Sequence, residues 1–287
     1  MASESPTRPA RAALRKRRER PGRRTAGLRR LRPRWRALHA LLAVPLAIGI
    51  LLGAIGVVAA WYAVNWVYHT TNKPAEVFFP WSDALTKTPP ETWQRYGRYF
   101  NEHATAVITP ELLAALAQVE GGGNPVARTY WRWRMAQNPF ELYQPASSSV
   151  GMYQITDATF REAKRYCIHD HVVVEEGPWD NPDSCWFNSL YTRIVPSHSI
   201  ELTAALLDRG VASAMERQQI TEASLQQKQD LAAVIHLCGA GAGDVYAQRG
   251  FRLTPRQRCG DHDVGIYLTR VNTMKRLFIR LADAGKE

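Results

Sequence analysis

One stretch constrains this chain more than any other: residues 37–68 contain no Lys, Arg, Asp or Glu. They read "ALHALLAVPLAIGILLGAIGVVAAWYAVNWVY". About 20 apolar residues are enough for a helix to span a bilayer. Trp35 precedes the stretch and Trp61 and Trp66 lie near its end, where aromatic side chains anchor membrane helices at the interface. We therefore expect a transmembrane helix over residues 37–68.

Two other interpretations of this stretch are a buried core helix and a cleaved signal peptide. A core helix of this length rarely lacks every charged residue. The apolar core of a signal peptide is shorter, about 7–15 residues, although Val58-Ala59-Ala60 would suit a cleavage site. The length therefore favours an uncleaved single-pass anchor.

The basic charge of the chain is concentrated in its first 36 residues. They carry 14 Lys and Arg against two Glu, a net charge of +12, whereas the whole chain carries +11. The remaining residues therefore carry about −1, so the charge gives no reason to expect a nucleic-acid partner. The positive-inside rule places this tail in the cytoplasm and residues 70–287 outside. A topology signal explains the tail; contact with anionic lipid or with a partner are alternatives.

All four cysteines follow the apolar stretch: Cys167, Cys185, Cys238 and Cys259. No two of them form a C-x-x-C pair, which argues against a zinc site. An even number on the exported side predicts two disulfides. The sequence leaves their connectivity open; we expect the local pairs, Cys167 with Cys185 and Cys238 with Cys259.

The remaining chain divides into a linker at 69–90, rich in proline, and a mostly α-helical domain at 91–287 without convincing alternating strands. Helix signals predict the following segments: from Thr109 to the glycines at 121–123, from Thr156 or Asp157, from Ser199 to a stop at Gly210, from 221 into a glycine-rich turn at 239–243, and over 263–285. On the last helix, one apolar stripe is expected to face the core: Tyr267, Val271, Met274, Phe278 and Leu281.

Glu120 ends an apolar helical run and precedes three glycines, in "LAALAQVEGGGNPVA" (113–127). The negative end of the helix dipole and the apolar neighbours both disfavour a charged carboxylate there. They favour a carboxylic acid that holds a proton and can donate it. The glycines would let a ligand approach closely. The alternative is a solvated glutamate at a helix end, with no role in chemistry.

Three further motifs follow Glu120: "SSSVGMYQIT" (147–156), "GAGAGDVY" (239–246) and "YLTRV" (267–271). Together with "EGGGNP", their order resembles the lytic transglycosylase catalytic domain of the goose-lysozyme-like superfamily. The family pattern runs Glu-Ser-x-x-Asn-Pro, Gly-Leu-Met-Gln, Ala-Tyr-Asn-x-Gly and a late Tyr. The resemblance covers about residues 108–282. It implies a lysozyme-like helical domain behind the membrane helix.

The resemblance also implies roles for particular residues. Glu120 matches the family's catalytic acid and base, and Tyr267 matches the late tyrosine of the pattern, which lies near that glutamate in the family. The substrate-binding residues that it implies are Ser149, Gly151, Met152, Tyr153, Gln154 and Tyr267. No metal and no cofactor is implied.

This chain departs from the family pattern at several places. Gly121 stands where the family usually has Ser, and "HLCGAGAG" lacks the Tyr and Asn of the third motif. Thirty residues separate Glu120 from Gly151, which indicates an insertion, "RTYWRWRMAQNPFELYQ" (128–144). Its aromatic side chains either stack on sugars or pack the insertion against the domain: Tyr130, Trp131, Trp133, Phe140 and Tyr143.

The implied substrate is the peptidoglycan glycan strand, cut at the β-1,4 bond between N-acetylmuramic acid and N-acetylglucosamine. Glu120 would act as acid and then as base, forming 1,6-anhydromuramic acid, whereas most glycosidases use two carboxylates. Glu141 and Asp157, the nearest acids downstream, lie in no motif. The family further implies a periplasmic domain at the inner membrane of a bacterium. It allows either general wall turnover or a secretion or conjugation assembly as partner.

Other functions were weighed against this one. A muramidase would hydrolyse the same bond with water, and a non-catalytic peptidoglycan-binding assembly subunit would keep the fold alone. "HDH" (169–171) and "DHD" (261–263) could be drawn as metal ligands, but each adjoins a cysteine and lacks further ligands. No G-x-S-x-G motif is present, and "GAGAG" follows no strand, which argues against a serine hydrolase and a dinucleotide site.

Overall fold

The computed structural model describes residues 32–81, 83–178, 180–181 and 184–285. The chain forms two compact units, Met1–Trp61 and Tyr62–Glu287. Of the basic tail expected at 1–36, residues 1–31 lie outside the described residues. The structure is 61% helical, which confirms the mostly α class.

Helix α1 (Arg32–Asn72) lies mostly in the first unit, and its residues after Trp61 belong to the second unit. The stretch from Ala43 to Asn72 contains an 18-residue window with a mean hydropathy of 2.4, and the helix is long and apolar enough to cross a membrane. The side chains at 43–60 are exposed. A helix that is apolar and exposed on all sides suits a lipid environment and not a protein core. The length and composition expected for the membrane segment are therefore confirmed.

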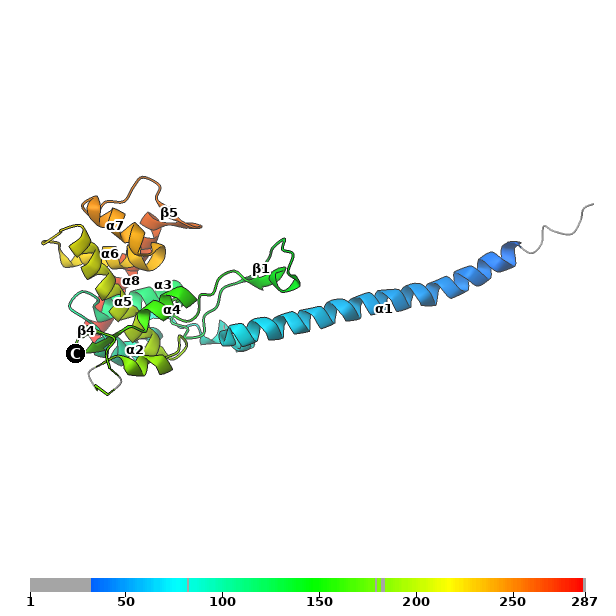
Figure 1. The fold of residues 1–287 in the computed structure, drawn as a ribbon, viewed down its shortest axis with the longest axis horizontal. Helices are drawn as coiled ribbons and strands as arrows, with labels where there is room; N and C mark the ends of the chain where they lie inside the picture. The colour runs from blue at the N-terminus through cyan, green and yellow to red at the C-terminus, as the bar shows by residue number, and fades with distance from the viewer. Residues whose placement is uncertain (1–31, 82, 179, 182–183, 286–287) are drawn as a thin grey trace, which may run out of the picture. The chain divides into compact units, whose positions relative to one another are not determined.

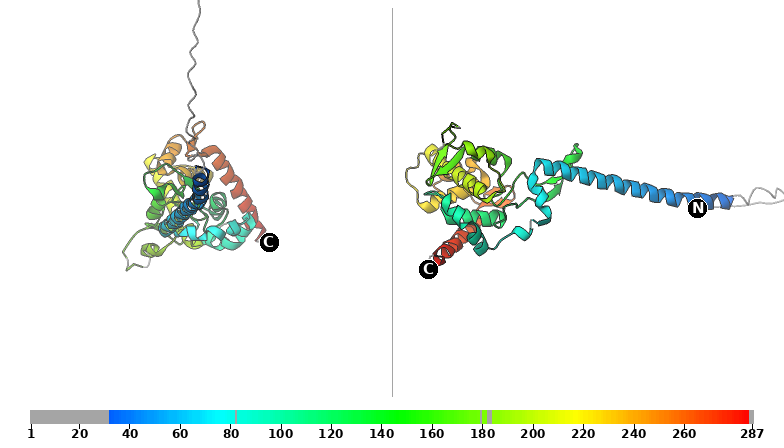
Figure 2. Two further views of the ribbon diagram at one scale, coloured as in Figure 1. Left: turned by 90° about the vertical axis from the view of Figure 1, so that its right-hand side faces the viewer. Right: turned by 90° about the horizontal axis from the view of Figure 1, so that it is seen from below.

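The second unit is a body of seven described helices, shown in Figure 1. They are α2 (Pro89–Glu102), α3 (Pro110–Gly121), α4 (Asp157–Ala163), α5 (Pro196–Arg217), α6 (Leu225–Cys238), α7 (Ala240–Gln248) and α8 (Val264–Ala284). Helix α3 lies at the centre because it is apolar on every side: residues 112–117 are all buried. It packs against α2 and α8, and α6 packs against α5, α7 and α8. The C-terminal end of α8 lies at the periphery of the body in both views of Figure 2.

The best-marked helices begin where the sequence predicts. Thr109 is the N-cap of α3, and Gly122 ends it in the left-handed conformation, with φ +58°. The hydroxyl of Thr156 accepts a hydrogen bond from the amide of Thr159 at the start of α4. Asp263 Oδ1 accepts from the amide of Ile266 at the start of α8. The apolar stripe of α8 packs into the core, as predicted.

Two expected helix ends are wrong, and both lie at glycines. Helix α5 does not stop at Gly210 but continues to Arg217, because Val211 and Ala214 in its next turn are buried against the core. The glycine-rich segment at 239–243 is not a turn: after Gly239, with φ +82°, the chain starts α7 at once. Tertiary packing overrides the low helix propensity of glycine at both places.

Three short antiparallel hairpins accompany the helices, although the sequence showed no convincing strand. They pair β1 (Trp131–Trp133) with β2 (Tyr143–Pro145), β3 (Tyr166–His169) with β4 (Val172–Glu175), and β5 (Arg258–Cys259) with β6 (His262–Asp263). Strands of two to four residues carry too few positions for an alternating pattern to be recognised.

The segment at 69–90 is folded and not an extended linker. After α1 it forms two 3₁₀ helices, η1 (Pro74–Trp81) and η2 (Asp83–Leu85). Two further 3₁₀ helices occur later in the chain, η3 (Pro139–Glu141) and η4 (Trp186–Leu190). The almost fully buried carboxylate of Glu76 holds this segment in place through its ion pairs with Lys73 and Arg128. Four prolines suggested a loop, but a buried charge needs partners and thereby orders its surroundings.

Both disulfides have the predicted pairing. Cys167 on β3 is bonded to Cys185, which precedes η4, and Cys238 at the end of α6 is bonded to Cys259 on β5. The bonds span 18 and 21 residues. Loops of this length lose chain entropy worth roughly 3 kcal/mol each in the unfolded state. The second disulfide joins the α6 end to the segment that leads into α8.

Candidate active site

Glu120 lies in the last turn of α3, and a phenol holds its carboxyl group. The hydroxyl of Tyr267 on α8 donates a hydrogen bond to Glu120 Oε1 at 2.5 Å. His236 Nε2 on α6 lies 3.8 Å from the same oxygen, a contact that becomes an ion pair when the imidazole is protonated. The Glu120 side chain is 17% exposed, so the carboxyl group still reaches solvent. Three helices thus place a carboxyl, a phenol and an imidazole together.

Burial of the Tyr267 ring, and next the charge and hydrogen bond of Glu120, raise the pKa of this phenol well above its ordinary value. Tyr267 therefore stays protonated and acts as a donor to the carboxyl group. Tyr267 and Glu120 are 147 residues apart in the sequence. The packing of α8 on α3 brings them together, as the resemblance implied.

His236 was not predicted as a site residue. It is the sole titratable side chain in "LAAVIHLC" (231–238), in the last turn of α6. An isolated histidine among apolar residues is the signal that could have drawn attention to it. Its ring also meets the ring of Tyr153 edge-on, with centroids 6.5 Å apart. This contact and the packing of α6 aim the imidazole at Glu120.

The motif at 147–156 forms a tight turn beside this cluster. Gly151 has φ +81°, and a Cβ there would lie 2.5 Å from the carbonyl oxygen of Arg193. Gln154 has φ +48°, and its side-chain amide donates to the carbonyls of Gly151 and Ala127. Glycine is therefore required at position 151, since glycine alone tolerates both this backbone conformation and the close approach of the Arg193 carbonyl.

Two residues of this motif lie elsewhere than expected. The side chains of Met152 and Tyr153 are fully buried in the core, and the Tyr153 hydroxyl donates to the carbonyl of Leu113. They therefore do not line a cleft, because the turn directs them inward. Ser149 is half-buried and its amide donates to Ser147 Oγ; its predicted contact with substrate stays a prediction.

A cavity of about 310 Å³ meets the carboxyl cluster at His236, whereas Glu120 and Tyr267 are not among its lining residues. Gln154 lines it from the turn and His236 lines it from α6. Its other walls come mainly from α4 and α5 and include the polar side chains Thr159 and Thr203. Thr203 Oγ1 is buried and has no hydrogen-bond partner among the described atoms. A polar group of a ligand could satisfy this hydroxyl, because buried polar atoms are normally paired.

Gly121 departs from the family pattern for a steric reason. A Cβ at this position would lie 2.7 Å from Met152 Cα and 2.9 Å from the Met152 carbonyl oxygen. These are backbone atoms of the turn at 151–154 and cannot move aside without shifting it. The close approach of α3 to this turn leaves room for glycine alone.

A second carboxylate contacts both a tyrosine and a histidine. Glu201 on α5 accepts hydrogen bonds from the amide of Ile168 at 3.0 Å and from the hydroxyl of Tyr191 at 2.7 Å. His103 Nδ1 lies 3.8 Å from it, and the ring of His198 stacks on Tyr191 with centroids 4.0 Å apart. Glu201 is buried and does not line the cavity beside His236, so its contacts indicate a structural role.

The remaining candidate residues lie apart from the carboxyl cluster. Asp157 pairs with Arg193 at 2.7 Å, and Glu141 is exposed on η3. His171 Nδ1 lies 2.9 Å from the carbonyl oxygen of Ala104. Within the described ranges, no group of three His, Cys, Asp or Glu side chains is arranged to hold a metal.

Comparison of the chain with family models, with curated proteins and with solved structures gave no match. The resemblance therefore rests on the motifs, and the proposal below rests on the motifs and the geometry.

Proposed function

We propose that the second unit is a peptidoglycan lytic transglycosylase with a lysozyme-like fold. The single observation that carries the proposal is the contact of Glu120 with Tyr267 and His236 at the end of α3, beside a cavity lined by Gln154. The family resemblance, found in separate motifs, requires Glu120 and Tyr267 to meet in space. Their meeting supports the resemblance, because residues so far apart in sequence have no local reason to do so.

In the proposed reaction, the protonated carboxyl group of Glu120 gives its proton to the glycosidic oxygen as the C–O bond breaks. The 2-acetamido oxygen of the muramoyl residue stabilises the positive charge at the anomeric carbon. The Glu120 carboxylate then takes the proton of the muramoyl 6-hydroxyl, whose oxygen closes the 1,6-anhydro ring. The carboxyl group returns to its starting state and no water is consumed.

The neighbours of Glu120 have positioning roles in this proposal. Tyr267 occupies Oε1 with its hydrogen bond, which leaves Oε2 to carry the transferred proton. His236 contacts the same carboxyl group and also lines the cavity, so it connects the proton donor to the space for the sugar. Neither residue is asked to form a covalent bond.

The location belongs to the proposal as well. Helix α1 would hold the protein in the inner membrane of a bacterium, with the N-terminus in the cytoplasm and the second unit in the periplasm. The membrane-spanning length of α1 and the two disulfides, which form in oxidising compartments, support this topology. Glycan strands would be the partner there, and a secretion or conjugation assembly is a further partner that the family implies.

The test is digestion of purified sacculi by the detergent-solubilised full chain, as wild type and as Glu120→Gln. Glu111→Gln is the matched control, because it makes the same change in the first turn of the same helix. Released muropeptides are weighed by mass spectrometry. We expect products lighter by one water than reducing sugars from the wild type and from the control, and none from Glu120→Gln.

Other outcomes would replace the proposal. Reducing ends in the wild-type products would identify a hydrolytic muramidase. Retained binding to sacculi without any release would identify a non-catalytic assembly subunit. Equal release by Glu120→Gln would remove Glu120 from the chemistry.

A further inference from the structure

Helix α1 is longer than a bilayer requires. Its candidate membrane span, Ala43–Asn72, has 30 residues, which gives a helix about 45 Å long. The hydrocarbon core of a bilayer is about 30 Å thick, so some ten residues are left over. The surplus contains the aromatic end of the stretch, which suits the interface better than the hydrocarbon.

The aromatic insertion packs against this surplus and not against the cavity beside Glu120. The rings of Trp133 and Tyr143 lie 6.2 and 5.8 Å from the ring of Tyr62. Phe140 stacks on Tyr68 with centroids 4.6 Å apart. The hairpin β1–β2 with its connecting η3, which we call the aromatic hairpin (residues 128–146), therefore covers one side of the last turns of α1.

Hydrogen bonds fix this arrangement. Asn65 Nδ2 donates to the carbonyl of Tyr143 at 2.7 Å, and His69 Nε2 lies 2.8 Å from the carbonyl oxygen of Phe140. Directional bonds from two turns of one helix set the position of the hairpin more strictly than ring packing alone.

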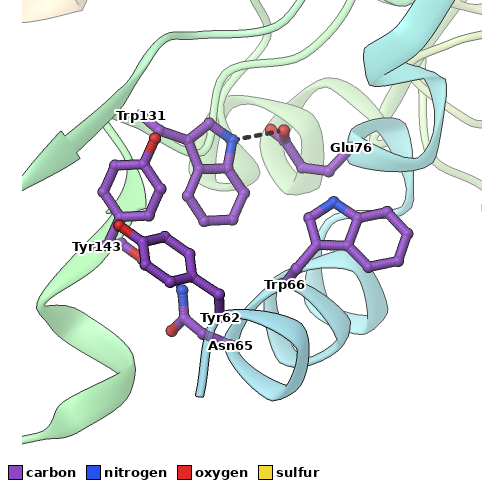
Figure 3. A pocket seen from close by; sticks show the side chains of 6 residues that line it. All are labelled: Tyr62, Asn65, Trp66, Glu76, Trp131 and Tyr143. Carbon is purple, nitrogen blue, oxygen red and sulfur yellow. Dashed lines mark hydrogen bonds between the residues drawn. The ribbon is translucent and has the colours of Figure 1, made fainter. Parts of the chain in front are cut away.

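A buried carboxylate anchors the base of the aromatic hairpin. Figure 3 shows the Trp131 indole donating to Glu76, at 2.9 Å. Arg128 and Lys73 pair with the same carboxylate, at 3.3 and 3.2 Å. The rings of Tyr62, Trp66, Trp131 and Tyr143 line a pocket of about 210 Å³ together with Glu76 and Asn65. The carboxylate is already neutralised by two cations, so the pocket is mainly aromatic in character.

The outer side chains of the aromatic hairpin have the composition of a membrane interface. Trp133 is 62% exposed, and Tyr130 and Met135 are exposed more fully still. Arg132 and Arg134 alternate with them and are exposed too. Aromatic and apolar side chains interleaved with arginines bind at the boundary between headgroups and acyl chains.

We propose that the aromatic hairpin is a second membrane contact, seated in the outer interface of the bilayer that α1 enters. Trp133 and Met135 reach the boundary of the acyl chains, and Arg132 and Arg134 meet lipid phosphates. The hairpin is hydrogen-bonded to the last turns of the membrane helix itself, so it lies where those turns leave the hydrocarbon. The inference rests on α1 as a membrane span and is independent of the proposed reaction.

The depth of labelled side chains in vesicles tests this proposal. All four native cysteines are in disulfides, so an introduced cysteine is the one thiol available for a nitroxide label. The full chain carries the label at Trp133→Cys or at Met135→Cys, in vesicles of phosphatidylethanolamine and phosphatidylglycerol. The reference positions are Leu52→Cys on α1 and Val172→Cys on β4, where the native side chains are each 62% exposed, as at Trp133.

The readout is the accessibility of each label to oxygen, which enters lipid, relative to a water-soluble nickel complex. We expect the ratio at 133 and 135 to lie well above that at 172 and to approach that at 52. Ratios at 133 and 135 equal to that at 172 would overturn the proposal. Labels at these two positions shielded from both reagents would instead indicate a protein contact, such as a second copy, and would overturn it too.

Two controls keep the outcome clear. The Met135 side chain is fully exposed, so Met135→Cys reports depth even if the Trp133 substitution disturbs the hairpin. An aqueous label at 52 would show that α1 does not enter the bilayer and would overturn both the span and the hairpin contact. Digestion of sacculi measures the proposed reaction separately, so the failure of one proposal is distinguishable from that of the other.

Discussion

At the scale of single residues, the site is defined by contacts that leave little freedom. Gly121 is the clearest case, because family resemblance suggests Ser where the backbone of Met152 leaves no room. We expect Gly121→Ser to destabilise the fold by about 1–3 kcal/mol, the usual cost of overpacking. Gly241→Ser is the control, since a Cβ at that helical glycine meets nothing within 4 Å. Thermal unfolding of both variants checks this, and equal melting temperatures would contradict it.

The hydroxyl of Tyr267 is expected to matter more than that of any other buried tyrosine. Tyr267→Phe removes the hydrogen bond to Glu120 Oε1 and leaves the carboxyl group without its donor. A hydrogen bond to such a group is worth about 1.5–3 kcal/mol, so release of muropeptides should fall about 10- to 100-fold. Tyr153→Phe, which loses a bond to a backbone carbonyl, should leave the rate nearly unchanged. A similar fall in muropeptide release in both variants would mean that the loss comes from a disturbed fold and not from the missing hydrogen bond to Glu120.

Stability is expected to fall in mild acid because of His103. Burial, its largest influence, lowers the pKa of His103 below its ordinary value, although Glu201 opposes this. The folded state therefore binds fewer protons than the unfolded state once the pH drops below about 6.5. The melting temperature should decline from pH 7.5 toward pH 5.5, and less steeply for His103→Gln. His198, whose pKa burial also lowers, keeps part of the slope in the variant.

At the scale of elements, two helical glycines face the same side chain with different clearances. A Cβ at Gly243 would lie 2.4 Å from Ile235 Cγ1, whereas one at Gly210 would lie 3.4 Å from Ile235 Cγ2. Gly243→Ala should therefore lower the melting temperature. Gly210→Ala should raise it, by the roughly 0.5–1 kcal/mol that alanine gains over glycine in a helix. A higher melting temperature for Gly243→Ala than for the wild type, or a lower one for Gly210→Ala, would contradict the packing of α5 and α7 on α6.

These glycines also show where prediction from sequence succeeded and failed. Helices α3, α4 and α8 began as predicted because Thr109, Thr156 and Asp263 are local signals next to apolar periodicity. Gly210 and Gly243 misled because each packs against Ile235 of α6, a contact between helices that the local sequence pattern does not show. The buried Glu76 has the same origin, since Arg128 and Trp131, far along the chain, hold its carboxylate.

At the scale of the whole molecule, the candidate site joins residues from three helices. The family resemblance implied that Glu120 and Tyr267 would meet. It assigned no role to His236, which was therefore missed. The burial of Met152 and Tyr153 could not be foreseen, because it depends on how the turn at 151–154 is set against α3. Sequence thus anticipated the contact between Glu120 and Tyr267 better than the positions of the residues around it.

The disulfides are expected to stabilise the second unit as a whole. Replacing Cys238 and Cys259 by serine should lower stability by roughly 3 kcal/mol, as for closing a loop of this length. Because this bond joins the end of α6 to the approach to α8, activity should fall together with stability. Thermal unfolding measures the change, and alkylation of the denatured, unreduced wild type should label none of the four cysteines. Two or more labelled thiols would contradict the disulfide assignment.

The folding of residues 69–90 has a consequence for reach. As an extended tether, 22 residues would span about 75 Å. Here Glu76 fastens the first half to Lys73 and Arg128, and the amide of Lys87 donates to the carbonyl of Gly122 at 2.8 Å, which fastens the second half to the end of α3. The described part of this segment is therefore bound to the domain and is not an extended tether. Under the proposed function, a glycan strand must therefore come to the domain, because the described part of this segment gives the domain no extended tether with which to reach it.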